Sequence, residues 1–204
     1  MAAHNDTTLA QRLESSIAAM LPEFETLRHD FHRHPETRFE ERWTADRIAR
    51  FLDAHGVACA RGYAGGTGIV ADIEGGDGPT VLLRADMDAL AIAEETGLPY
   101  ASEISGRMHA CGHDGHLAAL CGAAAALAAN RDLMPGVVRC VFQPGEEQGG
   151  GGRRMVAEGV CDGVVAAFAL HGWPTFPLGK AVIGAGPIMA SAGNFRITVR
   201  GRGG

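Results

Sequence analysis

The chain has 204 residues, of which 46% are hydrophobic and 21% charged, and its formal net charge is -6 at pH 7. This composition is typical of a globular protein and excludes the disordered and membrane classes, which lie at the extremes of apolar content and charge. The acidic balance and the absence of a basic run argue against a nucleic acid or an anionic membrane as a partner. The length suits one domain, or one domain and part of another.

The five cysteines are odd in number, widely spaced and nowhere arranged as C-x-x-C, so they predict neither a disulfide framework nor a zinc ribbon. Four of them lie in apolar segments and are expected in the core: Cys59, Cys121, Cys140 and Cys161. The N-terminus lacks the basic and apolar regions of a secretory signal. The longest apolar run, residues 117–129, is shorter than the roughly 20 residues that span a bilayer. We therefore expect a cytoplasmic protein.

The first predicted elements are helices. Apolar residues recur at helical spacing from Leu9 to Leu21, with Pro22 as a kink or a restart, and again from Arg42 to His55. Two short β-branched runs follow, at residues 68–73 and 80–85, and the glycine-rich residues between them predict a hairpin or a tight connection.

Helices and apolar strands alternate in the rest of the chain. We predict helices at 116–130 and 152–158 and strands at 137–142 and 164–170. Unbroken apolar strands that alternate with helices indicate an α/β fold, with a largely parallel sheet covered by helices on both faces. Residues 194–204 alternate like a further strand that ends at the last residue, so we expect the chain to stop just inside a second domain.

Polar side chains follow three of the predicted strands, at the edge where open α/β sheets bind their ligands. Asp86 and Asp88 follow one strand, Glu146 and Glu147 another, and His171 the last. Adjacent glutamates near a helix start are often solvated or pair with its dipole. Here one of them can ligate a metal while the other serves as general base. A lone histidine after an apolar strand is more often a hydrogen-bonded core residue, but its place at this edge favours a ligand.

The loop at residues 108–116 is rich in metal ligands, and its members are His109, Cys111, His113, Asp114 and His116. Thiolate and imidazole groups suit zinc, and the carboxylates admit manganese or cobalt. The alternative is a loop of solvated histidines with a buried cysteine, which the acidic surroundings disfavour. His32 is expected at the surface, and the pattern leaves the role of His34 open. A nucleotide-binding domain is disfavoured, because no glycine-rich turn in the dinucleotide or phosphate-loop pattern follows a strand.

Six motifs together resemble one family. They are RHDFHRHPETRFEE at 28–41, LRADMDAL at 83–90, EETGLPYAS at 94–102, MHACGHDGH at 108–116, FQPGEEQGGGG at 142–152 and ALHGWP at 169–174. In this order they closely resemble the metal-dependent amidohydrolases that include hippurate hydrolase, N-acyl-amino-acid aminoacylases and plant indole-acetyl-amino-acid hydrolases. The resemblance covers nearly the whole chain.

The resemblance implies a zinc-peptidase-like catalytic domain that holds two divalent metal ions, with an α+β lid domain inserted in the middle of the parent chain. Residues 1–187 would belong to the catalytic domain and residues 188–204 to the first strand of the lid. The matching positions imply that the metal ligands are Cys111, His113, Glu147 and His171. Glu146 matches the general base, Asp88 an aspartate that supports the site, and Asp86 its less certain neighbour.

The implied reaction is hydrolysis of the amide bond of N-acyl amino acids by a metal-activated water, with zinc, manganese or cobalt as the metal. The substrate would be a small molecule, and the intact parent would form homo-oligomers through its lid domain. Family members are about twice as long, so a further ligand histidine is expected outside this chain. The alternative is an inactive metal-binding fragment that lacks its C-terminal half.

Overall fold

The computed structural model describes residues 8–189, 193 and 195–202. The chain divides into two units, Met1–Gly172 and Trp173–Gly204, and every residue of the predicted site belongs to the first. In the second unit the described residues form turns and irregular segments. Residues 195–202 do not form the predicted strand, because no neighbouring strand pairs with them, and the rest of that prediction lies outside the described residues. That residues 188–204 belong to a second domain remains a prediction.

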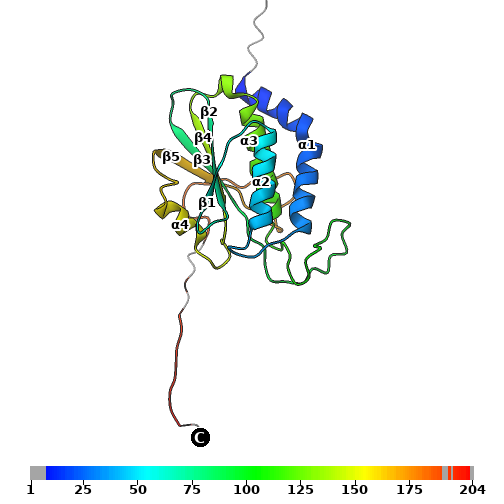
Figure 1. Ribbon diagram of the computed structural model, residues 1–204, viewed down its shortest axis with the longest axis vertical. Helices are drawn as coiled ribbons and strands as arrows, with labels where there is room; N and C mark the ends of the chain where they lie inside the picture. The colour runs from blue at the N-terminus through cyan, green and yellow to red at the C-terminus, as the bar shows by residue number, and fades with distance from the viewer. Residues whose placement is uncertain (1–7, 190–192, 194, 203–204) are drawn as a thin grey trace, which may run out of the picture. The chain divides into compact units, whose positions relative to one another are not determined.

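The first unit is built on one five-stranded sheet, whose strand order is β1-β2-β4-β3-β5 (Figure 1). The strands are β1 (Ala60–Tyr63), β2 (Gly68–Glu74), β3 (Thr80–Asp86), β4 (Val137–Gln143) and β5 (Val164–Ala169). β4, β3 and β5 run parallel to one another, whereas β1 and β2 form the antiparallel side of the sheet. The predicted α/β class is confirmed, and the three parallel strands are those that carry the candidate ligands.

The predicted hairpin between β2 and β3 is wrong, because β4 lies between these strands and pairs with both. Residues 75–79 instead form the predicted tight connection, which passes from β2 to β3 over the beginning of β4. There the amide of Gly75 donates to the carbonyl of Gly136 at 3.1 Å, and the amide of Gly78 donates to that of Pro135 at 2.8 Å. Short β-branched runs joined by a glycine-rich segment are common to a hairpin and to strands that a third strand separates, so the pattern alone could not decide between them.

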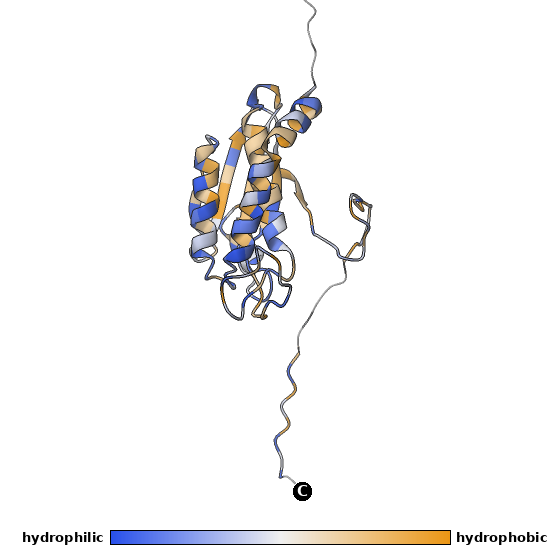
Figure 2. Cartoon of the chain, turned by 90° about the vertical axis from the view of Figure 1, so that its right-hand side faces the viewer, coloured by the Kyte–Doolittle hydropathy of each residue, from blue (hydrophilic) through white to orange (hydrophobic). Residues whose placement is uncertain are grey.

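Helices cover both faces of the sheet, as expected, and they are α1 (Leu9–Arg33), α2 (Arg42–Ala54), α3 (His113–Ala128) and α4 (Gly151–Ala157). A short 3₁₀ turn at Arg131–Leu133 follows α3. The helix α1 begins with a capping box between Thr8 and Gln11 and runs through Pro22 without ending there. Figure 2 shows helices that carry hydrophilic and hydrophobic residues on the same ribbon, and α1 and α2 have the pattern of amphipathic helices, whereas α3 is mostly apolar and buried.

Two hydrophobic clusters lie on opposite faces of the sheet. The larger joins α1, α2 and α3 to side chains such as Ile69, Ile73 and Phe142, and the smaller packs Met155 and Val160 against the other face. Side chains alternate between these clusters along each strand because successive residues of a strand point to opposite faces. The central strands β2, β3 and β4 are thereby covered on both sides, whereas the edge strands β1 and β5 are largely exposed.

Cys121 and Cys140 are buried, as predicted, and Cys59 is half-buried against the larger cluster. The prediction for Cys161 is wrong, because it lies exposed in the turn between α4 and β5. All five thiols are free. Among the described residues no helix combines the length and the apolar character that crossing a bilayer requires. The cytoplasmic location remains a prediction.

Candidate metal centre

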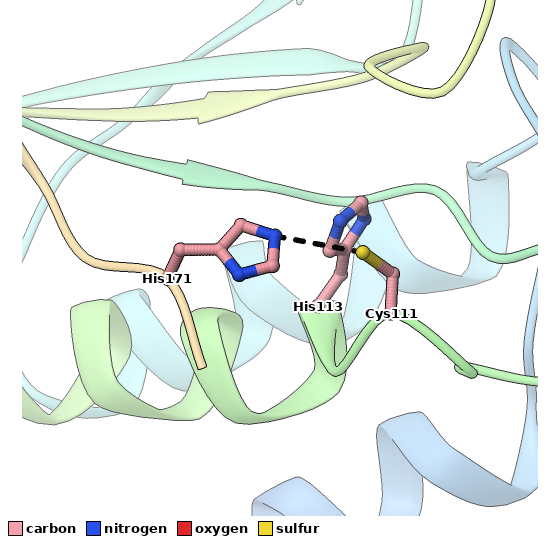
Figure 3. A group of neighbouring side chains, drawn as sticks. All are labelled: Cys111, His113 and His171. Carbon is pink, nitrogen blue, oxygen red and sulfur yellow. Dashed lines mark hydrogen bonds between the residues drawn. The ribbon is translucent and has the colours of Figure 1, made fainter. Parts of the chain in front are cut away.

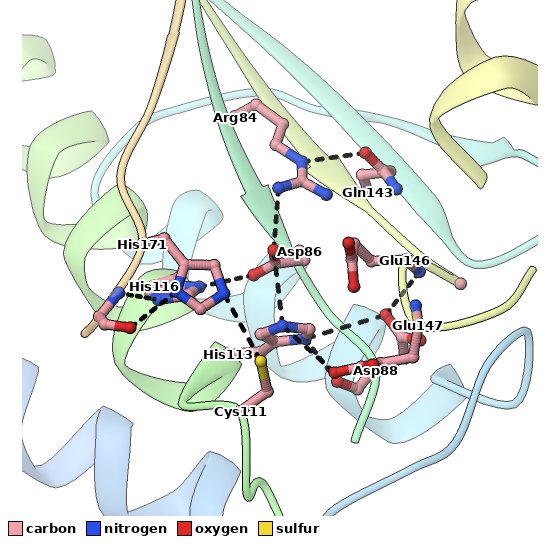
Figure 4. A network of polar contacts seen from close by, with 12 residues as sticks. Arg84, Asp86, Asp88, Cys111, His113, His116, Gln143, Glu146, Glu147 and His171 are labelled. Atoms are coloured by element: carbon pink, nitrogen blue, oxygen red, sulfur yellow. Dashed lines mark hydrogen bonds and ion pairs between the residues drawn. The ribbon is translucent and has the colours of Figure 1, made fainter. Parts of the chain in front are cut away.

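The candidate ligands lie together at the carboxyl ends of the three parallel strands (Figure 4). Asp86 is the last residue of β3, Glu146 and Glu147 lie in the turn that follows β4, and His171 lies just beyond β5. His113 is the first residue of α3, which packs against β3. Segments that are far apart in the chain thus bring the predicted residues to one edge of the sheet.

His113 presents an unpaired nitrogen to this cluster. Its Nδ1 atom lies 2.7 Å from the backbone carbonyl of Asp88, which can only accept, so Nδ1 carries the proton and Nε2 has a free lone pair. Nε2 is fully buried and has no hydrogen-bond partner among the described residues. It lies 3.6 Å from Asp86 and 3.8 Å from Glu147, measured to their carboxylate oxygens. Histidines that bind metals are held in this way, with the second nitrogen donating to a carbonyl or carboxylate.

Cys111 and His171 approach His113 from two other segments (Figure 3). The Sγ atom of Cys111 lies 3.5 Å from Nε2 of His171, and the ligand atoms of the three residues lie within 4.8 Å of one another. Between Cys111 and His113 stands Gly112, whose φ of 83° lies in the left-handed region that favours glycine. This residue turns the chain into α3, so that the side chains on either side of it face the same cluster.

The cluster concentrates negative charge. Burial raises the pKa of the Cys111 thiol to about 12, and the nearby carboxylates of Glu147, Asp86 and Glu146 act in the same direction. A divalent cation would reverse this effect, since a coordinating thiol is deprotonated by the metal. The donor set of sulfur, imidazole nitrogen and carboxylate oxygen therefore fits a divalent metal.

The side chain of Asp88 fixes the turn that carries the two glutamates. Its two carboxylate oxygens accept the backbone amides of Glu146 and Glu147 at 2.8 and 3.0 Å. Glu146 is exposed and Glu147 half-buried, and their carboxylates lie with His113 in a second group of candidate ligands within 4.8 Å. In Figure 4, His171 and Glu147 lie on opposite sides of His113. The arrangement leaves Glu146 open toward solvent, where a substrate can reach it.

Asp86 is held in its ionised form by two donors. Burial by itself would raise its pKa, but the hydrogen bond from His116 and the charge of Arg84 lower that pKa to about 2. Nδ1 of His116 lies 2.7 Å from one carboxylate oxygen of Asp86, and Nη1 of Arg84 lies 2.8 Å from the other. The carboxylate is thus already engaged on both oxygens.

The sequence analysis did not identify Glu41, a fully buried carboxylate that binds the turn carrying Glu146 and Glu147. It accepts the amide of Gly145 at 2.9 Å and the hydroxyl of Thr67 at 2.9 Å. Burial raises the pKa of Glu41 and the hydrogen bonds lower it, with a net increase. No spacing rule connects Glu41 to a turn that lies a hundred residues later, so only its place in the motif at 28–41 could have drawn attention to it.

The prediction that His32 lies at the surface is wrong. It is buried between Asp114 and Glu94, with ring nitrogens 2.8 Å and 3.2 Å from their carboxylates. The segment that carries Glu94 and Tyr100 covers this face of α1, which its helical pattern alone could not reveal. His34 stays outside the cluster, since its ring stacks on Trp43.

His109, the first histidine of the ligand-rich loop, belongs to none of the groups of candidate ligands that lie within 4.8 Å of one another among the described residues. It is buried with both ring nitrogens unpaired among the described residues. Burial lowers its pKa to about 4, so its ring is neutral at pH 7. Of the three histidines in the loop, only His113 therefore directs an unoccupied nitrogen at the candidate ligands.

The fold and the site define an α/β protein with a metal-binding cluster at the carboxyl ends of its parallel strands. The pattern of Peptidase family M20/M25/M40 matches residues 82–203, and the chain belongs to this family. It is 43% identical over 179 residues to an N-acetylcysteine deacetylase of Bacillus subtilis, a match that covers 87% of this chain and 47% of the relative. It is 40% identical to the IAA-amino acid hydrolase ILR1-like 4 of Arabidopsis thaliana, over 87% of this chain and 40% of the relative.

Solved structures show the same fold. The YXEP protein of Bacillus subtilis, described as a dinuclear metal binding peptidase from the M20 family, matches with a TM-score of 0.76 and 42% identity. That match covers 78% of this chain and 45% of the solved one. A putative aminohydrolase from methicillin-resistant Staphylococcus aureus matches with a TM-score of 0.75 and 39% identity, over 79% of this chain and 42% of the other. The chain thus spans about half the length of the relatives that it matches.

Proposed function

We propose that this chain provides the metal centre and the general base of a metal-dependent amidohydrolase, which cleaves the amide bond of N-acyl amino acids. The observation that carries the proposal is the buried, unpaired Nε2 of His113, around which a thiol, a second imidazole and two glutamates converge. An orphaned buried nitrogen is costly unless a ligand satisfies it, and a divalent cation suits all of these donors.

The proposed ligands are Cys111, His113, Glu147 and His171, which would together hold two divalent ions. When bound, such ions polarise a carbonyl and lower the pKa of a water. Zinc, manganese and cobalt all accept this mixture of sulfur, nitrogen and oxygen donors. The number of ions is supported by the solved Bacillus subtilis relative, which is described as a dinuclear metal binding peptidase.

Glu146 is the proposed general base, because it is the glutamate of the pair that stays open to solvent. Its carboxylate takes a proton from the attacking water as the oxygen adds to the amide carbon. The same carboxyl group then gives that proton to the leaving nitrogen as the carbon–nitrogen bond breaks. The products are a carboxylate and a free amino acid. Asp88 holds the backbone amides of both glutamates, and it thereby keeps the base and the ligand pointing in their different directions.

The substrate class follows from the relatives, which are named for an acetylated cysteine and for indole-acetyl amino acids. These substrates share an amino acid linked through its nitrogen to an acyl group, and the acyl groups differ widely. Hippurate, which carries a benzoyl group, belongs to the same chemical class. We propose that the protein acts on this class, and a panel of the three acyl groups would identify the preferred one.

The first test replaces Glu146 by Gln, which keeps the size of the side chain and removes the base. We expect the Glu146→Gln protein to retain its metal, as measured by elemental analysis. The rate at which it releases free amino acid should fall about 10²- to 10⁴-fold. Cys111→Ala should instead lose metal and activity together.

Glu95→Gln is the matched control, because this exposed glutamate lies outside the cluster and its replacement should change neither reading. Wild-type rates in metal-loaded Glu146→Gln would refute the assignment of the base. A wild-type chain that binds metal but hydrolyses none of the three substrates would favour the alternative of a metal-binding chain without activity.

A further inference from the structure

His116 lies in the first turn of α3, one helical turn beyond His113, and both of its ring nitrogens are engaged. Its Nε2 accepts the backbone amide of Gly172 at 2.8 Å, so this nitrogen is unprotonated. Its Nδ1 must then carry the proton, and it donates to a carboxylate oxygen of Asp86 at 2.7 Å. The hydrogen bonds on the two sides thus require the same tautomer of His116.

The contact at Gly172 continues to His171. The carbonyl oxygen of Gly172 lies 2.7 Å from Nδ1 of His171, so Nδ1 carries the proton and donates to it, while Nε2 lies 3.5 Å from the sulfur of Cys111. A single residue, Gly172, therefore donates through its amide to His116 and accepts through its carbonyl from His171. The chain of contacts runs from Arg84 and Asp86 through His116 to His171 (Figure 4).

We propose that His116 is a positioning residue, which sets the orientation and the tautomer of His171 through the backbone of Gly172. The inference rests on the proposed function, in which His171 is a metal ligand. It also gives His116 a role different from that of its neighbour His113, although the ligand atoms of Asp86, His113 and His116 lie within 4.8 Å of one another.

The geometry favours positioning over ligation for His116. A ligating imidazole must offer a lone pair, and the only lone pair of His116 is taken by the amide of Gly172. His113 shows the contrast, because its Nε2 is buried without a partner among the described residues. Groups that orient a metal ligand from outside the coordination sphere typically contribute about 10- to 100-fold to metal affinity. A metal titration can measure a change of this size.

Two substitutions separate the two sides of His116. His116→Gln places an amide oxygen near the former Nε2, so it can still accept the amide of Gly172. His116→Asn places its amide near the former Nδ1, so it can still donate to Asp86 but cannot reach Gly172. Both variants carry a side-chain amide, so they are chemically matched. His116→Gln keeps the hydrogen bond to Gly172, and His116→Asn keeps the one to Asp86. Circular dichroism of each variant verifies that the protein is folded.

The metal-free protein gives a first reading by ¹⁵N NMR. In the wild type we expect a scalar coupling across the hydrogen bond between the Gly172 amide and Nε2 of His116, and a ring of His171 protonated on Nδ1. His116→Gln should keep the Nδ1 tautomer of His171, whereas His116→Asn should lose that preference. Absence of the coupling in the wild type, or the same His171 tautomer in folded His116→Asn, would overturn the inference whether or not the chain binds metal.

Cobalt(II) gives the second reading, through the thiolate-to-cobalt absorption of Cys111. We expect His116→Asn to weaken cobalt binding by about 10- to 100-fold and His116→Gln to remain close to the wild type. Full affinity in His116→Asn with a loss in His116→Gln would show that His116 acts through Asp86 and would overturn the inference. An equal loss in both variants, or in neither, would overturn it as well. A wild type that binds no cobalt would refute the proposed function, while the NMR reading would still decide the role of His116.

Discussion

His113 and His116 stand one turn apart on α3, yet the groups that face them give their rings different chemistry. His113 donates to a backbone carbonyl of Asp88 and keeps its second nitrogen for the cluster. His116 uses both nitrogens within the protein. At the scale of single residues the function of a histidine is therefore set by whether a donor from another element occupies its unprotonated nitrogen, as the Gly172 amide does at His116.

A second buried network lies next to the metal centre, where His32 contacts the carboxylates of Asp114 and Glu94. The hydrogen bond that His32 donates to Asp114 raises the pKa of His32, against the opposing effect of burial, and Glu94 raises it further. We predict that His32→Gln lowers the free energy of unfolding by roughly 1 to 3 kcal/mol below pH 6.5, as expected for a buried hydrogen bond to a charged group.

The loss should shrink as the pH rises. A histidine whose pKa is higher in the folded than in the unfolded protein contributes its full stability below the unfolded value, near 6.5, and loses it as the pH passes the folded value. Urea unfolding of both proteins between pH 6 and 9 measures the difference. A gap that stays constant or grows with pH would contradict the prediction. His55→Gln, which removes the pair with the half-exposed Glu23, is the control and should remove at most about 1 kcal/mol.

Much of the candidate site could be predicted from the sequence, because ligand-rich loops and strand ends are visible as residue types and positions. Cys111, His113, Glu147 and His171 do converge, as expected. The tautomers of His113 and His116 and the buried positions of Glu41 and His32 could not be predicted in this way. They depend on partners that only the fold brings near, such as the Gly172 amide and the segment around Glu94.

At the scale of elements, the approach of α1 to α3 depends on one small residue. A methyl group added at Gly122 would lie 2.9 Å from two ring atoms of Phe24, a buried residue that also packs edge-on against Phe51. We predict that Gly122→Ala lowers the free energy of unfolding by about 1 to 3 kcal/mol, because an overpacked core must shift.

Gly115→Ala, in the same helix, is the matched control. A methyl group there meets nothing within 4 Å, so the gain in helix propensity should leave stability unchanged or raise it by up to about 1 kcal/mol. Phe24→Leu should reduce the loss caused by Gly122→Ala in a double-mutant cycle, because the two residues are in contact. Equal effects at the two glycines in thermal unfolding would contradict this account of the packing.

The four helices and the strands β2 to β5 followed from the apolar patterns of the sequence, whereas β1 and the order of the strands did not. The runs that became β2 and β3 were recognisable as strands, but nothing in their pattern indicates that β4 pairs between them. Strand order is decided by which edges meet in three dimensions, and local alternation does not encode it.

At the scale of the whole molecule, metal binding should be linked to stability. The proposed ligands come from α3 and the loop before it, from the turn after β4 and from the segment after β5, so the complete set exists only in the folded chain. An ion present at about 100 times its dissociation constant would add roughly 2.7 kcal/mol, which is about 5 to 10 °C in the midpoint of thermal unfolding. Differential scanning calorimetry with added zinc or manganese measures this shift.

A chelator should reverse the shift, and Cys111→Ala should show little or none. An equal rise in Cys111→Ala and in the wild type would mean that the metal binds elsewhere. The comparison is made at one protein concentration, so that any self-association affects both proteins alike.

The place of β4 between β2 and β3 also bears on how the chain folds during synthesis. When β2 and β3 have been made, only the antiparallel pair β1–β2 can form, because every other ladder needs β4 or β5. The centre of the sheet must therefore wait for a segment made some fifty residues after β3, and closing so long a loop slows folding. Until β4 leaves the ribosome, β3 is an unpaired apolar strand, and this interval is when the nascent chain is most exposed to aggregation.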